Sequence, residues 1–374
     1  MHQKPFLASL LLAAFPLLAT AEPLISFGRQ VPLYITGNAT LRHDDNIFLR
    51  ATNEEDDLIF IFAPGADLQF VGSDTKAGVT YTHQWISYMT NTDLDSDLDS
   101  FTGMFSHQRP RSRWSLDGAV VELDQNNFNA RNFEESARRT VSEVSAAASW
   151  DVTAKTSVGT GTSFERTEYE STRFVGNTVW EVPVDWYYAV SPKMDLSAGY
   201  RIRQTKLKAT DNDSKDHFLN VGARGRFSSK LEGQVRVGVT QRRPETGESS
   251  SLLGLSSTLT YAVTPKTTFE LNAANDFSSA ASGVSQKVLR LGVTGRFELS
   301  MRWSVNSSVN FDSSEYLDRN ARKDDFIVAS VGIAHALTAN SSFEVSYLHR
   351  KNRSNFEVVN FDNQVVSASA SMRF

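Results

Sequence analysis

Residues 194–203, with the sequence MDLSAGYRIR, decide the fold class because apolar and polar side chains alternate along them. Leu196 and Tyr200 belong to the apolar set, and Asp195 and Arg201 belong to the polar set. A strand places successive side chains on opposite faces, whereas a helix of period 3.6 would scatter the two sets around its axis. The stretch therefore predicts a β-strand with one apolar and one polar face.

The same alternation returns along most of the chain, in segments joined by polar connections that are short and longer in turn. Residues 188–193 (YAVSPK) come back almost unchanged as residues 261–266 (YAVTPK). The lysines of four such short turns are 38, 37 and 36 residues apart, at Lys155, Lys193, Lys230 and Lys266. The repeating unit is therefore a two-strand hairpin with one short end and one long end, as in bacterial membrane barrels.

Counting these segments predicts an all-β, transmembrane, antiparallel up-and-down β-barrel of about 18 strands, with short periplasmic turns and longer extracellular loops. The strands are expected to begin near residues 32, 58, 76, 99, 113, 139, 156, 178, 194, 216, 231, 250, 267, 285, 303, 324, 341 and 361. The first third of the chain is the least regular, so 16 strands is the alternative. Pro64 lies inside the second expected strand, where we expect a bulge or an early strand end because proline cannot donate to the ladder. The first expected strand, residues 33–41, is short and polar.

The beginning of the chain reads as a secretory signal peptide. An apolar run, Phe6 to Leu18, is followed by Ala19-Thr20-Ala21, a cleavage site of the small-x-small type. We expect residues 1–21 to be removed and residues 22–374 to form one outer-membrane barrel domain. The chain has no cysteine, which fits passage through the oxidising periplasm.

Aromatic residues gather beside the short turns, as expected for a girdle at the membrane boundary. They begin or end the strands there, at Trp114, Trp150, Tyr188, Phe227, Tyr261, Phe269, Phe297, Trp303 and Phe343. The last strand alternates up to Phe374, with Met372 in the same apolar set. A terminal phenylalanine on such a strand resembles the signal read by the barrel assembly machinery, so Phe374 and Met372 are the predicted assembly signal.

Residues 43–49 (HDDNIFL) lead through the acidic stretch 54–57 (EEDD) to 58–61 (LIFI) and 63–65 (APG). This pattern resembles the putative β-barrel porin 2 family, which includes outer-membrane barrels encoded with exopolysaccharide synthesis clusters. The resemblance implies an integral protein of the Gram-negative outer membrane and a part in polysaccharide export. It supplies no catalytic motif to carry over.

The polar face of the later strands is rich in arginine. The candidate lumen-lining, substrate-contacting residues are Arg201, Arg203, Arg224, Arg226, Arg236, Arg242, Arg290 and Arg296. Fewer acids share that face, among them Asp195, Glu232, Glu270, Asp276 and Glu298. Rings of arginine favour the passage of anions, and a guanidinium binds a carboxylate in a bidentate way. The alternative is a hydrated wall of mutually paired charges that selects nothing.

Two other clusters contain residue types that could form a chemical site. Asp93, Asp95, Asp97 and Asp99 alternate as in a calcium loop, but the required glycine and glutamate are missing, which favours a solvated loop. The pair Asp216-His217, together with His349, lies near the expected extracellular ends, where a surface hydrolase would keep its site, yet no zinc pair or nucleophile motif accompanies them. We therefore expect no enzyme, no metal and no cofactor.

Three functions stay open. The favoured one is translocation of an exopolysaccharide, in particular an anionic one, with periplasmic polysaccharide-export proteins as partners. The second is a general or anion-preferring diffusion porin for small solutes, and the third is a scaffold barrel without conductance. No expected connection exceeds about 15 residues, which favours a wide bore over one narrowed by a long loop. Outer-membrane lipid and lipopolysaccharide are the expected surroundings, and a net charge of −5 argues against nucleic acid as a partner.

Overall fold

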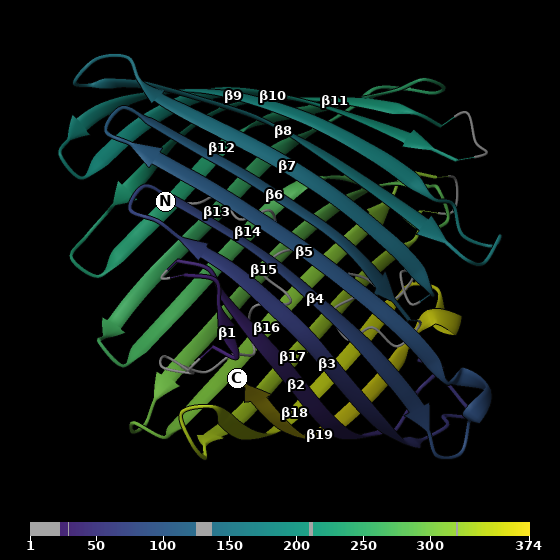
Figure 1. Ribbon diagram of the computed structural model, residues 1–374. Helices are drawn as coiled ribbons and strands as arrows, with labels where there is room; N and C mark the ends of the chain where they lie inside the picture. The colour runs from purple at the N-terminus through teal and green to yellow at the C-terminus, as the bar shows by residue number, and fades with distance from the viewer. Residues whose placement is uncertain (1–22, 29, 125–136, 209–211, 319–320) are drawn as a thin grey trace.

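The computed structural model describes residues 23–28, 30–124, 137–208, 212–318 and 321–374, and it forms one closed ring of antiparallel strands. Eighteen long strands, β2 to β19, each pair with the next along the chain, and β19 pairs back with β2 (Figure 1). The two-residue strand β1 (Ile25–Ser26) lies beside the beginning of β2. The predicted 18-strand barrel is therefore confirmed.

The strand bounds agree closely with the alternation in the sequence, and every strand begins within three residues of its expected position. They are β2 Pro32–Asp44, β3 Asp57–Val71, β4 Thr75–Tyr88, β5 Ser96–Arg109, β6 Ser112–Leu123, β7 Arg139–Asp151, β8 Thr156–Tyr169, β9 Asn177–Ser191, β10 Met194–Leu207, β11 Ser214–Arg226, β12 Leu231–Pro244, β13 Ser250–Thr264, β14 Thr267–Ser279, β15 Ser285–Glu298, β16 Trp303–Tyr316, β17 Lys323–Ala336, β18 Ser341–Ser354 and β19 Phe361–Arg373. Two single-turn 3₁₀ helices, Thr92–Leu94 and Glu357–Val359, lie in connections. No helix in the described part of the chain is long and apolar enough to cross a membrane.

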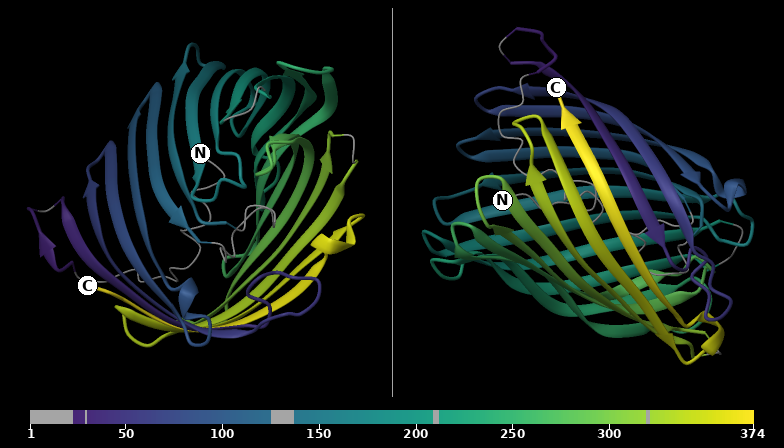
Figure 2. Two further views of the ribbon diagram at one scale, coloured as in Figure 1. Left: turned by 90° about the vertical axis from the view of Figure 1, so that its right-hand side faces the viewer. Right: turned by 90° about the horizontal axis from the view of Figure 1, so that it is seen from below.

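The barrel has a short-turn end and a long-loop end, which lie on opposite sides in Figure 1. Figure 2 shows the ring of strands from the long-loop end in its left panel. The expected signal peptide, residues 1–21, lies outside the described residues.

Closure is more complete than the short, polar first strand suggested. β2 extends to Asp44, and its pairing with β19 runs from Thr36 opposite Arg373 to Asp44 opposite Val365. At the other end of this seam, the N–H of Ile35 donates to the carbonyl of Phe374 at 2.6 Å, and the N–H of Phe374 donates back at 2.9 Å. Every backbone group in a membrane needs such an internal partner, so the seam satisfies the closure requirement. The role of Phe374 and Met372 as an assembly signal stays a prediction.

The bulge or early strand end expected at Pro64 is wrong. β3 runs through it, and Gly37 lies opposite Pro64 in the ladder with β2. On the other side the β3–β4 pairing omits Ala63 and Pro64, yet Phe62 opposite Trp85 and Gly65 opposite Thr82 keep one register. The backbone donor that proline lacks is therefore accommodated by two positions without a partner in β4, and no extra residue is inserted in the strand.

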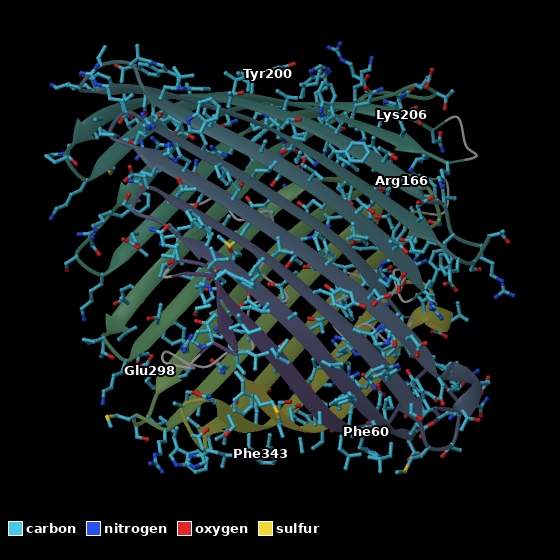
Figure 3. The ribbon with its side chains drawn as sticks, in the orientation of Figure 1. Phe60, Arg166, Tyr200, Lys206, Glu298 and Phe343 are labelled. Atoms are coloured by element: carbon cyan, nitrogen blue, oxygen red, sulfur yellow. The ribbon has the colours of Figure 1, made fainter. Side chains whose placement is uncertain are left out.

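The outward face is apolar. Tyr200 and Phe343 lie on the outside of the ribbon at opposite edges of the barrel, and Phe60 also faces outward (Figure 3). Near the short turns, the rings of Trp114 and Trp150 meet edge to face with centroids 5.1 Å apart. This apolar, aromatic surface has the character that lipid requires.

The inward face differs between the two ends. At the long-loop end it is filled by buried side chains, among them an apolar cluster of Ile47, Ile59, Ile61, Ile86, Tyr88 and Leu98. Ile47 belongs to the connection between β2 and β3, so that connection packs against the inner side of the wall. Further toward the short-turn end, inward side chains such as Thr258 and Glu270 are exposed.

Candidate functional site

The eight arginines of the predicted site all lie on the inward face, on β10, β11, β12 and β15. They alternate with outward apolar residues such as Leu196, Tyr200 and Leu219, which are 47, 43 and 68% exposed. We call these eight residues the arginine array. Each of them lies within 4.0 Å of a carboxylate oxygen.

The tightest part of the array surrounds Asp216 at the long-loop end. The register places Asp216 directly between Arg203 on β10 and Arg242 on β12. Arg203 donates to its carboxylate at 2.6 and 2.9 Å, and Arg242 donates at 2.7 and 2.8 Å. Asp216 and Arg242 are 1 and 2% exposed, so this network is buried. Each charge in it therefore depends on its partners for stabilisation.

A second carboxylate, Asp276 on β14, contacts Arg203 as well and also its neighbour Arg201. It accepts hydrogen bonds from Arg201 at 2.6 Å and from Arg203 at 2.9 Å, although three strands separate β10 from β14 in the ring. The carbonyl oxygens of Phe277 and Ser278 accept from Arg203 at 2.8 Å and from Arg242 at 2.6 Å. The end of β14 is therefore held against the inner sides of β10 and β12.

This arrangement arises because β14 leaves β13 at its long-loop end, whereas β15 stays paired with β16 as far as Gln286. The β13–β14 pairing stops at Leu255 opposite Asn275, whereas β13 continues to pair with β12 as far as Ser250. The side-chain amide of Asn275 donates to the carbonyl of Leu253 at 2.6 Å where the ladder ends. We call residues 276–285 the inward hairpin, because β15 is paired with β16 from Gln286 onward.

The tip of the inward hairpin is packed and buried. Phe277, Ala280 and Ala281 are 2% exposed or less. The N–H of Val175, in the connection between β8 and β9, donates to the carbonyl of Ala281 at 2.7 Å. Gly283 has a φ of +80°, and a Cβ there would lie 3.3 Å from Val175, so both its backbone conformation and its surroundings favour glycine.

A second charged group lies on the inner face nearer the short-turn end. Arg236 donates to Asp185 at 2.6 Å and to the hydroxyl of Tyr187 at 3.0 Å. Arg224 donates to Asp195 at 2.9 Å, and its guanidinium carbon lies 3.3 Å from the centre of the Tyr187 ring. Ion pairing and the aromatic ring thus hold both guanidinium groups along the wall.

Two of the remaining arginines are held more loosely. Arg226 and Arg296 are next to the short turns, their side chains are 62 and 42% exposed, and their nearest carboxylate contacts are 3.5 and 4.0 Å. Arg290 is 3.8 Å from Asp312. Exposed guanidinium groups with long contacts can bind an anion from solution at less cost than the buried, bidentate pairs.

Sequence reasoning found the arginines and missed half of their partners. Asp185, Asp312 and Glu181 were not assigned to the polar face, although alternation from Tyr187 would have placed Asp185 there. Asp216 was grouped with His217 as a surface pair, but the two face opposite sides, because His217 contacts the outward hydroxyl of Tyr200 at 2.6 Å. The excess of unpaired arginine inferred from the sequence therefore becomes a nearly balanced set of ion pairs.

The other two clusters do not assemble into a site. His349 lies 2.6 Å from Asp362 at the outward rim, away from Asp216. Asp95 accepts from the N–H of Tyr88 at 2.7 Å, and Asp99 contacts Tyr81 and His83. Within the described ranges, no group of three or more His, Asp or Glu side chains could hold a metal ion.

Comparison with known proteins adds a family and a fold. A family model described as Putative beta-barrel porin 2 matches residues 38–374. A comparison with curated protein sequences finds no match. Among solved structures, a BenF-like porin from Pseudomonas fluorescens Pf-5 is similar with a TM-score of 0.52 and 9% identity, covering 93% of this chain and 100% of that chain. The outer membrane protein opdK from Pseudomonas aeruginosa matches with a TM-score of 0.50 and 10% identity, over 93% of this chain and 100% of its own. At these identities the likeness shows the fold alone.

Proposed function

Because the chain belongs to this family of β-barrel porins, we propose that it lies in the Gram-negative outer membrane and lets small polar solutes diffuse across it. The single observation that carries the proposal is the inward hairpin. Its β14 arm has left β13 and is tied to arginines of β10 and β12 by Asp276 and two carbonyl oxygens. Diffusion porins narrow their bore with chain that folds inward, and here a hairpin of the wall has that position.

The hairpin also changes the balance between the two transport hypotheses. The expected wide bore rested on the absence of long loops, but the inward chain is a strand hairpin whose own connection is short. An exported polysaccharide has to thread a continuous hydrated path, since each buried hydroxyl without a partner costs on the order of 1–3 kcal/mol. Buried groups such as Phe277 and Val288 at the long-loop end offer no such partners. The hypothesis of exopolysaccharide translocation gains no support from this arrangement.

The arginine array supports at most a weak preference for anions. Its buried arginines are neutralised by Asp216, Asp276 and Asp185, so their charges largely cancel at a distance. Arg226 and Arg296 remain accessible at the short-turn end, which is the periplasmic end in barrels of this kind. A small anion passing that end can bind them transiently.

The proposal is tested by reconstituting the purified protein in planar bilayers and in liposomes. We expect single-channel conductance, and liposome swelling with monosaccharides that falls steeply as the sugar is lengthened. Swelling that does not depend on sugar length, together with lower polysaccharide secretion after gene deletion, would favour the polymer channel. A barrel that folds but neither conducts nor supports swelling would favour a scaffold.

A further inference from the structure

A group of cations lies on the outward face of the barrel, at the long-loop ends of β8, β10, β11 and β12, away from the transport path. The outward side chains there include Arg166, Lys206, Lys208, Lys215 and Arg243. We call these five residues the cationic rim. Figure 3 labels Arg166 and Lys206 on the side of the barrel that carries the long loops.

Strand register makes the rim a continuous surface. Arg166 and Lys206 both lie opposite Thr178 of β9, so they flank it on one face at one level. Lys215 lies opposite Arg243 on one side and opposite Gln204, two residues before Lys206, on the other. Neighbouring strands are about 4.8 Å apart, so the group is as wide as one to a few lipid headgroups.

Much of this positive charge is not neutralised by the protein. Glu168 pairs with Arg166 at 2.8 Å and also with Lys208. Lys206, Lys215 and Arg243 are exposed, and within the described residues none of them forms an ion pair. The contact of Arg243 is with the neutral amide of Gln241 at 3.1 Å.

Other sectors of the outward rim differ. On β15 to β18, Lys287 pairs with Glu315 at 3.6 Å and Lys351 pairs with Asp362 at 2.7 Å. On β5, Asp99 adds negative charge at the same end of the barrel. Lys323 and Arg353 are exposed there too, but the ladders place Glu315 opposite Lys323 and Asp325 opposite Arg353. The register places no acid opposite Lys206, Lys215 or Arg243, so these cations of the rim lack neighbouring acids in the ladder.

The residues beneath the rim face lipid. Trp180, Leu219 and Val239 are 49, 68 and 57% exposed on the same outward face, closer to the middle of the barrel. A cation facing lipid is costly at the midplane of the bilayer and much less costly near the interface, so the rim has to lie at headgroup level. A ligand that contacts both the cationic rim and the apolar surface beneath it needs acyl chains and a negatively charged headgroup.

We propose that the cationic rim binds the phosphorylated glycolipid of the outer leaflet, lipopolysaccharide, through its lipid A phosphates. Arg243 can bind a phosphate in a bidentate way, and Lys206 and Lys215 act as flexible point charges beside it. The acyl chains lie along Trp180 and Leu219. The proposal rests on the outer-membrane location proposed above and does not depend on which solute the channel carries.

The test uses the full barrel in detergent and counts bound lipid A by native mass spectrometry. The variant Lys206→Gln/Lys215→Gln/Arg243→Gln should bind lipid A at least roughly tenfold more weakly, since each cation near a charged lipid surface contributes appreciably to binding. The matched control Lys287→Gln/Lys323→Gln/Arg353→Gln removes the same charge from the outward strand ends of β15, β17 and β18. It should bind within about twofold of wild type.

Two further probes separate the lipid from its parts. Dephosphorylated lipid A should bind all three proteins weakly, and inorganic phosphate alone should not displace lipid A. An equal loss in both triple variants, or displacement by inorganic phosphate, would overturn the proposal. If the protein is recovered from outer membranes but the wild type binds lipid A weakly, the lipopolysaccharide proposal is overturned. If the protein is recovered from another cell fraction, the proposed outer-membrane location is refuted instead.

Discussion

The side chains on two sides of the inner wall form different kinds of contacts. In the arginine array, Arg201 and Arg203 on β10 reach Asp276 on β14, so contacts skip several strands. On the opposite side, which we call the hydroxyl sector, short side chains bond within their own strand or to the adjacent one, as in Thr40 to Ser369 at 2.8 Å. Ser308 and Ser330, on β16 and β17, do the same at 2.8 Å.

The difference shows what reshapes a barrel wall. Hydrogen bonds between adjacent strands do not change the shape of the wall, because they join residues that the ladders already place side by side. Long guanidinium side chains can join strands that the ladder does not, and here they stabilise the end of β14 after it has separated from β13. Substitutions on the two sides of the wall should therefore differ in the size of their effects.

Replacing Asp216 should break the arginine array most severely. In Asp216→Ala, the buried guanidinium groups of Arg203 and Arg242 lose their shared carboxylate, and breaking a buried ion pair from one side costs roughly 3–5 kcal/mol. We expect a clearly lower urea midpoint for unfolding of the barrel in detergent, followed by circular dichroism. An unchanged midpoint would mean that the network does not stabilise the wall.

Replacing Asp276 should free the inward hairpin with a smaller loss of stability. In Asp276→Asn, the charge that ties β14 to Arg201 and Arg203 disappears, while Asp216 still pairs with Arg203. We expect higher or more variable single-channel conductance in planar bilayers. The control is Asp312→Asn, because Asp312 lies 3.8 Å from Arg290 on the adjacent strand, outside the inward hairpin, and conductance there should stay at the wild-type value. If both variants conduct alike, the hairpin is not what narrows the path.

Replacing the exposed arginines should change selectivity and leave stability nearly intact. Arg226→Gln/Arg296→Gln removes two accessible cations whose nearest carboxylates are 3.5 and 4.0 Å away. Exposed ion pairs contribute roughly 0–1 kcal/mol, so folding should be unaffected. The reversal potential in a salt gradient should shift toward cations by a modest amount. A larger shift in Arg201→Gln/Arg236→Gln would show instead that the paired arginines set the selectivity.

The smallest effect is expected in the hydroxyl sector. Thr40→Val removes one hydroxyl that bonds to Asn38 and Ser369, each at 2.8 Å. A single neutral hydrogen bond contributes on the order of 1 kcal/mol, and here the ladder between β2 and β19 remains. The urea midpoint should therefore move far less than in Asp216→Ala. A comparable shift would erase the distinction between the two sides of the wall.

The sequence by itself determined the strands, their number, their faces and the position of the arginine array. It could do so because alternation and turn residues are local signals, and a barrel repeats them with little variation. It also placed Asp276 on the inward face.

Only the tertiary structure decided what the inward face does. The pairing of Arg203 with Asp276, two residues 73 positions apart, depends on the curvature of the ring and on the point at which β14 leaves β13. No local pattern marks that point, because Asn275 and Asp276 continue the same alternation as the residues before them. The inward hairpin is therefore absent from the periodic signal, since it depends on contacts between distant residues that only the closed barrel brings together.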